Sequence, residues 1–322
     1  DDDVPLGPAR HRSVAGIPLE LLELPPHALE PLVHEPAPLV PPPVLLLGPH
    51  AADDLVGVPQ EGGGHPQAQT LEPGFRSLLR AMGDDHGWDE TGYNGHPYLL
   101  TPVLDEMAGS GLRMDHFYSA HPSCSPTRGS VMTGRHPNRY GTFNPNWSIR
   151  PEEITVAEIL HNAGYACGHF GKWHLGDNYP SRPGDQGFDE SVVHLGGGMG
   201  QPGDFTTYFK FDSSYFDPVL WHNDQQESYK GYCSDIFNAE ALRFIEQNKA
   251  GPFFCYLAYN APHTPLQVPD KYYQMYRDVD PTKGFEGDDR PFPAMSDKDK
   301  EDARKVYAMV TNLDENVGKM LQ

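Results

Sequence analysis

Three short segments of the sequence carry side chains that can bind an anion and attack an electrophile. Cys124 and Arg128 lie in CSPTR, Lys172 and His174 lie in GKWHLG, and His263 lies in NAPHTP. A thiol beside cations is reactive because the positive charge stabilises its thiolate. Lysine, arginine and histidine donate the charge-assisted hydrogen bonds that hold an oxyanion. Together these residue types predict an anion-binding site that contains a nucleophile.

Asp84 and Asp85 are candidate ligands for a metal ion. They lie side by side in GDDHGW, and adjacent carboxylates offer the oxygen atoms that Ca²⁺ and Mg²⁺ prefer. The same pair is also typical of a turn or a helix cap. The other candidates have structural interpretations too: a cysteine is often a small buried hydrophobe, a lysine a solvated charge, and a loop histidine a partner of the backbone. Only the combination favours a functional site.

Helices alternate with short apolar runs from about residue 81 onward, and these elements must position the candidate residues. Helices are expected at TPVLDEMAGSG (101–111), TVAEILHNAG (155–164) and SDIFNAEALRFIEQNK (234–249). Strands are expected at LRMDHFYS (112–119), YACGHFG (165–171) and FFCYLAY (253–259). Such alternation predicts an α/β fold with a mostly parallel sheet flanked by helices. Functional loops of this class follow the carboxyl ends of the strands.

The local sequence also predicts how some side chains are presented. Lys172 and His174 are two residues apart on an extended segment, so both are expected to face one ligand while Trp173 packs on the other side. Ser125 and Pro126 suit a helix start, which would place the preceding cysteine at the positive end of a helix dipole. The run FRSLLRAMG (75–83) is interpreted as polar or helical, because arginines fall where a buried strand is apolar.

Composition limits the partners and the organisation of the chain. The 322 residues carry 24 basic and 45 acidic side chains, a net charge of -21, which disfavours nucleic acid and anionic membranes as general partners. No apolar run is long enough for a membrane span, and no signal peptide is visible after the opening Asp-Asp-Asp. The four cysteines lack the paired spacing of a zinc ribbon or a disulfide framework.

The first 80 residues differ from the rest. They hold 15 of the 33 prolines and no aromatic residue before Phe75. Proline-rich sequence without aromatics cannot bury enough apolar surface to offset the conformational entropy lost on ordering. Residues 1–80 are therefore interpreted as a low-complexity or disordered segment. A second hypothesis is that this segment is not native coding sequence, since it contains no lysine, asparagine or tyrosine. Residues 81–322 then form the folded domain.

The motifs resemble those of the formylglycine-dependent sulfatases. CSPTR followed by TGR matches that family's C-x-P-x-R signature, and GYACGHFGKWHLG is similar to its second signature. The segment YLAYNAPHTPLQVP resembles arylsulfatase B-like members. The resemblance implies the α/β fold of the alkaline phosphatase superfamily and identifies residues 81–322 as part of a catalytic domain.

The resemblance also implies roles for individual residues. Cys124 would be oxidised by the formylglycine-generating enzyme to an aldehyde, whose hydrate attacks sulfur with one hydroxyl and releases sulfate by collapse of the other. Arg128 would hold this side chain. Lys172 and His263 would bind sulfate oxygens, His263 would protonate the departing alcohol, and His174 would bind the hydrate and assist its deprotonation.

One Ca²⁺ ion, with Mg²⁺ less expected, is implied as the cofactor. Asp84, Asp85 and the modified Cys124 would ligate it. The family supplies two more ligands in an Asp-Asn-Gly segment, and a later lysine, after a helix like the one containing NLDENVGKMLQ. We therefore expect a fold incomplete at both ends, in which this chain has little or no activity.

Three functions follow from the resemblance. The first is hydrolysis of an aryl or carbohydrate sulfate ester, and the alternatives are phosphonate or phosphodiester hydrolysis and binding of sulfated glycans without turnover. The aromatics of residues 194–226 are expected either to stack on a sugar or to pack internally. The family's usual export favours a periplasmic, extracellular or lysosomal location.

Overall fold

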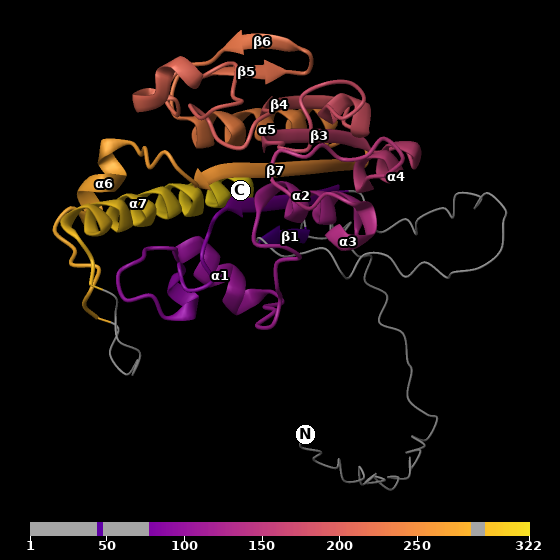
Figure 1. Cartoon of the computed structure of the whole chain (residues 1–322). Helices are drawn as coiled ribbons and strands as arrows, with labels where there is room; N and C mark the ends of the chain where they lie inside the picture. The colour runs from indigo at the N-terminus through magenta and orange to yellow at the C-terminus, as the bar shows by residue number, and fades with distance from the viewer. Residues whose placement is uncertain (1–43, 48–76, 285–293) are drawn as a thin grey trace, which may run out of the picture. The chain divides into compact units, whose positions relative to one another are not determined.

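The computed structural model describes residues 44–47, 77–284 and 294–322 (Figure 1). The chain divides into two units, residues 1–40 and 41–322, and all described residues belong to the second. Most of the predicted low-complexity segment 1–80 therefore lies outside the described residues. Within it, the described parts are Val44–Leu47 and residues 77–80.

The described residues form one mixed, mostly parallel sheet with strand order β1-β2-β7-β3-β4-β5-β6. The first five strands in this order run parallel, and the last two continue the sheet antiparallel. The strand bounds are β1 Val44–Leu47, β2 Ser77–Asp84, β3 Ala166–Lys172, β4 Glu190–His194, β5 Val219–His222, β6 Gln225–Ser228 and β7 Phe253–Pro262. This arrangement confirms the predicted fold class.

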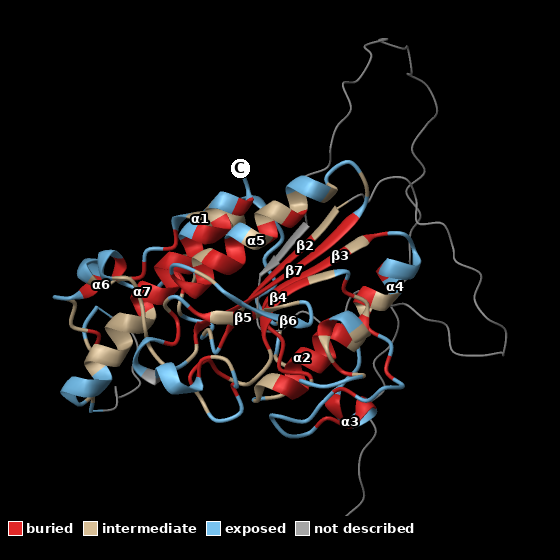
Figure 2. Cartoon of the chain, turned by 90° about the horizontal axis from the view of Figure 1, so that it is seen from above, coloured by how far each residue is buried: buried red, intermediate tan, exposed pale blue. Residues whose placement is uncertain are grey.

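Helices cover both faces of the sheet (Figure 2). Helices α1, α5 and α7 lie on one face, and α2 and α4 lie on the other. The α-helices span α1 Pro102–Ser110, α2 Cys124–Thr133, α3 Pro137–Tyr140, α4 Val156–Asn162, α5 Cys233–Asn248, α6 Asp270–Tyr276 and α7 Asp297–Met320. Short 3-10 helices span Gly92–Asn94, Pro183–Gln186 and Tyr208–Ser213.

Strand β7 divides the core into two layers by the alternation of its side chains. Phe253, Cys255 and Leu257 pack into the cluster that includes α5 and α7. Phe254 and Tyr256 point the other way, into the cluster that includes α2 and α4. Because every residue of β7 is buried, the strand reads as a continuous apolar run, as is typical of a central parallel strand.

Several predicted elements are confirmed. Helix α1 begins after Thr101 with a proline in its first turn and ends before Gly111. Helix α4, within the predicted helix 155–164, begins with a capping box, in which the Thr155 hydroxyl accepts from the backbone of Glu158 and the Glu158 carboxylate accepts from the backbone of Thr155. The predicted segments 165–171, 234–249 and 253–259 correspond to β3, α5 and β7.

The interpretation of residues 75–83 as polar or helical is wrong for the described part of that run, residues 77–83. The run before the aspartate pair is strand β2 and is paired on both sides, with β1 and β7. Arg80 lies within this strand and is only 6% exposed. The strand was not predicted because a charged residue interrupts its apolar pattern. The fold therefore does not lack this strand, which begins four residues before the predicted boundary at 81.

The predicted strand at residues 112–119 is absent, and this segment is irregular. Leu112 is 86% exposed, and Arg113 bonds Asp115 and the Tyr93 carbonyl instead of a sheet neighbour. An apolar run without a partner strand gains no ladder hydrogen bonds, so it stays a loop. The segment that carries Cys124 consequently follows a loop, not a strand.

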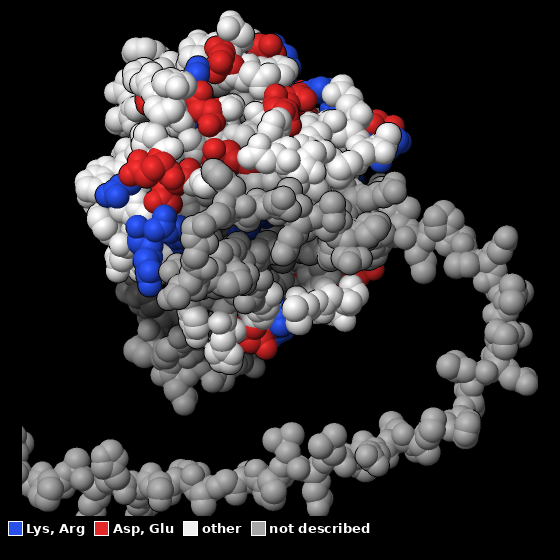
Figure 3. All heavy atoms as spheres, turned by 90° about the vertical axis from the view of Figure 1, so that its right-hand side faces the viewer, with Lys and Arg blue, Asp and Glu red and all other residues white. Residues whose placement is uncertain are grey.

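The surface of the described residues is mixed in charge. Figure 3 shows separate acidic groups scattered over one face, with basic groups beside several of them. No helix of the described residues is both long and apolar enough to cross a membrane. All four cysteines are unpaired.

Candidate active site

The candidate residues converge at the carboxyl ends of three adjacent strands. Asp84 ends β2, Lys172 ends β3, and His263 directly follows β7, which lies between them. Parallel strands end at the same edge of a sheet, so side chains far apart in sequence meet there. The structure thus confirms that the polar segments gather at this edge.

Asp84 lies at the centre of a buried charged network. Its Oδ1 accepts from Arg128 Nη2 at 2.9 Å, and its Oδ2 accepts from Lys172 Nζ at 2.5 Å. Burial alone would raise the pKa of Asp84, but the Lys172 and Arg128 cations outweigh it and hold that pKa well below its usual range. The carboxylate is therefore charged, and it holds two cations in place.

Arg128 and Lys172 are themselves buried, at 2% and 0% exposure. Arg128 also donates from Nη1 to the Lys172 backbone carbonyl at 2.7 Å. Buried charges are stable only when they are paired and hydrogen-bonded. Two cations share one carboxylate here, so the network has a surplus positive charge that can receive an anion.

A glycine directly before Lys172 permits this arrangement. Gly171 has a φ of 115°, and a Cβ there would lie 1.9 Å from the Ala258 carbonyl oxygen of β7. Only glycine adopts this conformation and allows this approach. Trp173, on the other side, is buried against Phe188, which confirms the prediction that it packs.

Cys124 is the first residue of α2 and is partly buried. Burial by itself would raise the pKa of its thiol, but a hydrogen bond with His263 and the positive charges of Lys172 and Arg128 lower it overall. The helix N-terminus adds a favourable dipole for negative charge. Cys124 is therefore placed where an anionic side chain is stabilised.

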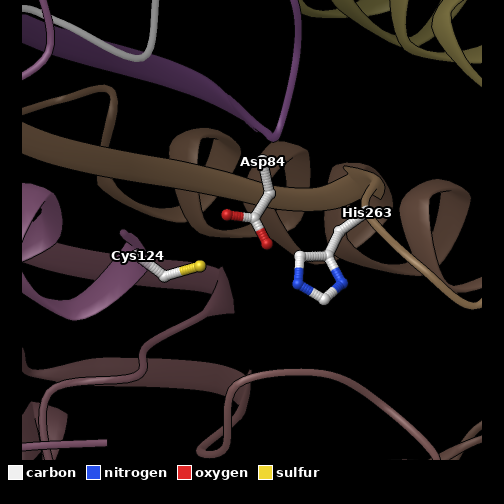
Figure 4. A group of neighbouring side chains, drawn as sticks. All are labelled: Asp84, Cys124 and His263. Carbon is white, nitrogen blue, oxygen red and sulfur yellow. The ribbon is translucent and has the colours of Figure 1, made fainter. Parts of the chain in front are cut away.

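His263 faces Cys124 and Asp84 across the site. Figure 4 shows the three side chains converging from different elements on the same space. The His263 Nδ1 lies 2.6 Å from the Thr264 carbonyl, so Nδ1 donates to it. Burial alone would lower the pKa of His263, whereas the hydrogen bond with Cys124 and the nearby Asp84 raise it overall.

The same three side chains form a candidate metal-binding cluster among the described residues. One ligand atom each from Asp84, Cys124 and His263 lie within 4.8 Å of one another. Asp85 lies outside this cluster: its side chain is 62% exposed and its Oδ2 is 3.5 Å from His263 Nε2. The two aspartates supply the donors that suit a hard cation, whereas a thiol and an imidazole suit it poorly. An oxygen in place of the Cys124 sulfur would improve the fit.

His174 lies beside the network and is 5% exposed. Burial and the charges of Lys172 and Arg128 lower its pKa to about 3. Its Nε2 lies 2.6 Å from Asn146 Oδ1. No sequence pattern predicts this contact, because 28 residues separate the two and Asn146 lies in a loop.

His194 is a second residue that sequence reasoning missed. It ends β4 and is paired in register with Lys172. Its imidazole is fully buried, and neither nitrogen has a hydrogen-bond partner in the described part of the chain. Burial, then the charges of Lys172 and Arg128, lower its pKa well below the usual value. A neutral histidine therefore lies next to Lys172 on the neighbouring strand.

A cavity of about 220 Å³ opens at the site. Its lining includes Asp84, Asp85, Cys124 and Arg128, together with His86 and His121. Pockets for drug-sized ligands usually measure about 300–1,000 Å³. The cavity therefore has room for a small anionic group and for part of an alcohol esterified to it. The rest of a larger ligand would extend over the surface.

Comparison with known proteins identifies the family. The family model described as Sulfatase matches residues 78–322. The chain belongs to the sulfatase family. Its α/β sheet is the fold of the alkaline phosphatase-like superfamily.

Curated sulfatases are identical to this chain at about a third of the aligned positions. N-acetylgalactosamine-6-sulfatase of Homo sapiens is 33% identical over an alignment of 217 residues, and the match covers 59% of this chain and 40% of the relative. An arylsulfatase of Hemicentrotus pulcherrimus is 34% identical over an alignment of 237 residues, and the match covers 68% of this chain and 42% of the relative. The chain thus spans about two fifths of the length of these sulfatases.

A solved structure extends the similarity to three dimensions. Ps i-CgsB in complex with k-i-k-neocarrahexaose is 32% identical, with a TM-score of 0.59 over 76% of this chain and 53% of that one.

The aromatic residues within 194–226 divide between the surface and the core. Phe205 and Phe209 are exposed, whereas Tyr215 is buried.

Proposed function

We propose that the protein hydrolyses sulfate esters of a carbohydrate alcohol, with a formylglycine made from Cys124 as the nucleophile. The observation that carries the proposal is the convergence of Cys124, Arg128, Lys172 and His263 around the buried Asp84 carboxylate. Similar proteins support the substrate class, because one is named N-acetylgalactosamine-6-sulfatase and another was solved with k-i-k-neocarrahexaose.

The cations of the site bind the sulfate group. Lys172 and Arg128 are held by one shared carboxylate, so they are positioned before the substrate arrives. Preorganised charges stabilise developing negative charge without the cost of reorientation. In this proposal Arg128 also holds the nucleophilic side chain, since it lies one helical turn after Cys124.

The histidines divide the proton transfers. The Asp84 charge and the hydrogen bond to the Thr264 carbonyl raise the pKa of His263 and favour a protonated ring, which can donate a proton to the departing alcohol. The lowered pKa of His174 keeps that ring neutral, so it can accept a proton from the nucleophilic side chain. A general acid and a general base are usually two groups whose environments shift their pKa values in opposite directions.

Asp84, Asp85 and the oxygen of modified Cys124 would hold a divalent cation, with Ca²⁺ as the proposed ion. The ion would supply Lewis-acid polarisation of the ester. The formylglycine-generating enzyme is the proposed partner that prepares Cys124.

Two measurements on the purified protein test the proposal. Mass spectrometry of the peptide containing Cys124, with an aldehyde-reactive label, should detect formylglycine. Matched sulfate, phosphate and phosphonate esters of one alcohol should show slow turnover, as expected for a chain predicted to have little activity, with the fastest rate for sulfate. Cys124→Ala should abolish both signals, whereas Cys167→Ala should keep them, because burial raises the pKa of the Cys167 thiol to about 12 and it lies away from the site.

Other outcomes replace the proposal with a stated alternative. Faster turnover of the phosphonate would identify a phosphonate or phosphodiester hydrolase. Binding of a sulfated oligosaccharide by protein that carries an unmodified Cys124 and shows no turnover would identify a glycan-binding module.

A further inference from the structure

Asn146 contacts His174, and the roles described above leave it unassigned. Its side-chain Oδ1 lies 2.6 Å from His174 Nε2. An amide oxygen can only accept a hydrogen bond, so this contact places the imidazole proton on Nε2. The other ring nitrogen, Nδ1, is buried and has no hydrogen-bond partner in the described part of the chain. It therefore keeps a free lone pair.

The backbone of Asn146 is fixed to the helix that carries the nucleophile. Its N–H donates to Ser125 Oγ at 3.1 Å, and Ser125 follows Cys124 in α2 and is fully buried. Asn146 has a φ of 68°, a left-handed conformation that asparagine tolerates better than most residues. Its amide is therefore held at a set position relative to Cys124.

Gly197 confines the ring of His174 from another segment. A Cβ at this position would lie 2.9 Å from His174 Cε1 and 3.0 Å from Nε2. The backbone at residue 197 therefore approaches the imidazole as closely as the absence of a side chain allows. Contacts from Asn146 and Gly197 leave the ring little freedom to flip.

We propose that Asn146 is a positioning residue that holds His174 in its Nε2-protonated tautomer, so that Nδ1 is the atom that takes up a proton during the reaction. The proton moves from the free hydroxyl of the sulfated nucleophilic side chain: the O–H bond breaks, an N–H bond forms at Nδ1, and the electron pair left on oxygen forms a C=O bond as the C–O bond to the departing sulfate breaks. The Nε2–H bond to Asn146 then stabilises the imidazolium. The proton transfer rests on the proposed function, whereas the tautomer does not.

The tautomer matters because the ring is neutral before the transfer. Burial and the charges of Lys172 and Arg128 lower the pKa of His174 to about 3. A neutral imidazole has one donor and one acceptor nitrogen, and the hydrogen bond at one nitrogen decides the role of the other.

Three variants separate this role from general effects on folding. Asn146→Gly removes the amide and keeps the left-handed backbone. Asn146→Asp keeps an acceptor oxygen at the same place. Asn223→Gly is the matched control, because Asn223 also has a positive φ of 52° and its Oδ1 accepts from Ser191 N–H at 2.8 Å, outside the site.

Nitrogen-15 NMR of histidine-labelled protein reads the tautomer directly, with His174→Gln to assign the signal. At pH 7.5 we expect the Nε2–H tautomer in the wild type, Asn146→Asp and Asn223→Gly. Asn146→Gly should show an added Nδ1–H population. A wild-type Nδ1–H tautomer, or an unchanged ratio in Asn146→Gly, would overturn the inference. If Asn146→Gly does not fold, the wild-type and Asn146→Asp spectra still decide.

Kinetics on formylglycine-containing protein provide the second readout. Asn146→Gly should lower kcat about 10–100-fold and should change KM little. A loss of this size is usual when a residue that orients a metal-binding side chain by a hydrogen bond is removed. Asn223→Gly should match the wild type. The two proposals fail separately: absent turnover with the Nε2–H tautomer intact refutes the proposed function alone, whereas normal turnover in Asn146→Gly refutes only the role of Asn146.

Discussion

At the scale of single residues, the site depends on a small number of buried charges that have no solvent to replace a lost partner. Asp84 neutralises Lys172 and Arg128 together, so removal of any one of the three leaves an unbalanced charge in the interior. Removing one partner of a buried pair typically costs about 3–5 kcal/mol. Residues of this kind serve stability and chemistry at once.

The first prediction concerns Lys172. We expect Lys172→Met to lower the free energy of unfolding by about 3 kcal/mol, because it breaks a buried pair, and to abolish turnover. Urea denaturation measures the first effect. Lys230→Met is the control, since the Lys230 side chain is 86% exposed in its pair with Asp217 and exposed pairs contribute little. Equal effects of the two substitutions would contradict the prediction.

The second prediction concerns His169, which stacks on Tyr256 with ring centroids 4.8 Å apart. Burial, then the charge of Arg128, lowers the pKa of His169 to about 3. A lowered pKa means that the unfolded state binds the proton more readily, so stability is present above the unfolded pKa of about 6.5 and is lost as the pH falls below it, by up to about 1.4 kcal/mol per pH unit.

Substitution of this histidine tests that dependence. His169→Phe should reduce the loss of stability between pH 6.5 and pH 4, because the contribution of His169 disappears while those of His174 and His194 remain. Urea unfolding of wild type and variant across this range measures it. The idea fails if the two proteins lose stability in parallel. His161→Phe is a suitable control, since its side chain is 51% exposed.

At the scale of elements, the close approach of β3 and β7 positions Lys172. Gly171→Ala should destabilise the protein by several kcal/mol, because its Cβ would lie 1.9 Å from a backbone oxygen of β7 and a strand cannot yield as a flexible side chain does. Gly164→Ala isolates the backbone strain, since Gly164 also has a positive φ, 89°, but no atom within 4 Å of its Cβ position.

The expected difference between these variants is large. Gly164→Ala should cost only about 1–2 kcal/mol, the usual penalty of a left-handed conformation. Thermal unfolding followed by circular dichroism can compare the two variants. A similar cost at both positions would show that the close contact between β3 and β7 is unimportant.

At the scale of the whole molecule, metal binding is the property that the described residues support least completely. Their cluster offers three ligand atoms, whereas Ca²⁺ takes six to eight oxygens. We therefore expect the protein with unmodified Cys124 to bind Ca²⁺ with a dissociation constant of about 10⁻⁴ M or weaker, measured by isothermal titration calorimetry. Micromolar binding that Asp84→Asn removes would show that further ligands complete the site.

Sequence reasoning reached the fold class because it depends on local patterns, and the candidate site residues were predicted from local motifs. Helix caps, apolar runs and the spacing of Cys124, Lys172 and His263 are visible in the chain itself. It failed at β2, where the buried Arg80 broke the expected apolar pattern, and at residues 112–119, where an apolar run has no sheet neighbour. Whether a segment becomes a strand depends on the partners it meets.

The sequence by itself determined which side chains are present and that Lys172 and His263 lie at the ends of strands of one parallel sheet. Only the tertiary structure decided that Asp84 binds both Lys172 and Arg128, that His194 is buried behind them, and that Asn146 contacts His174. The physical reason is that hydrogen bonds and pKa shifts depend on distances of a few ångströms between residues that lie tens of positions apart. Such distances are set by the packing of the sheet and its loops, which no local pattern encodes.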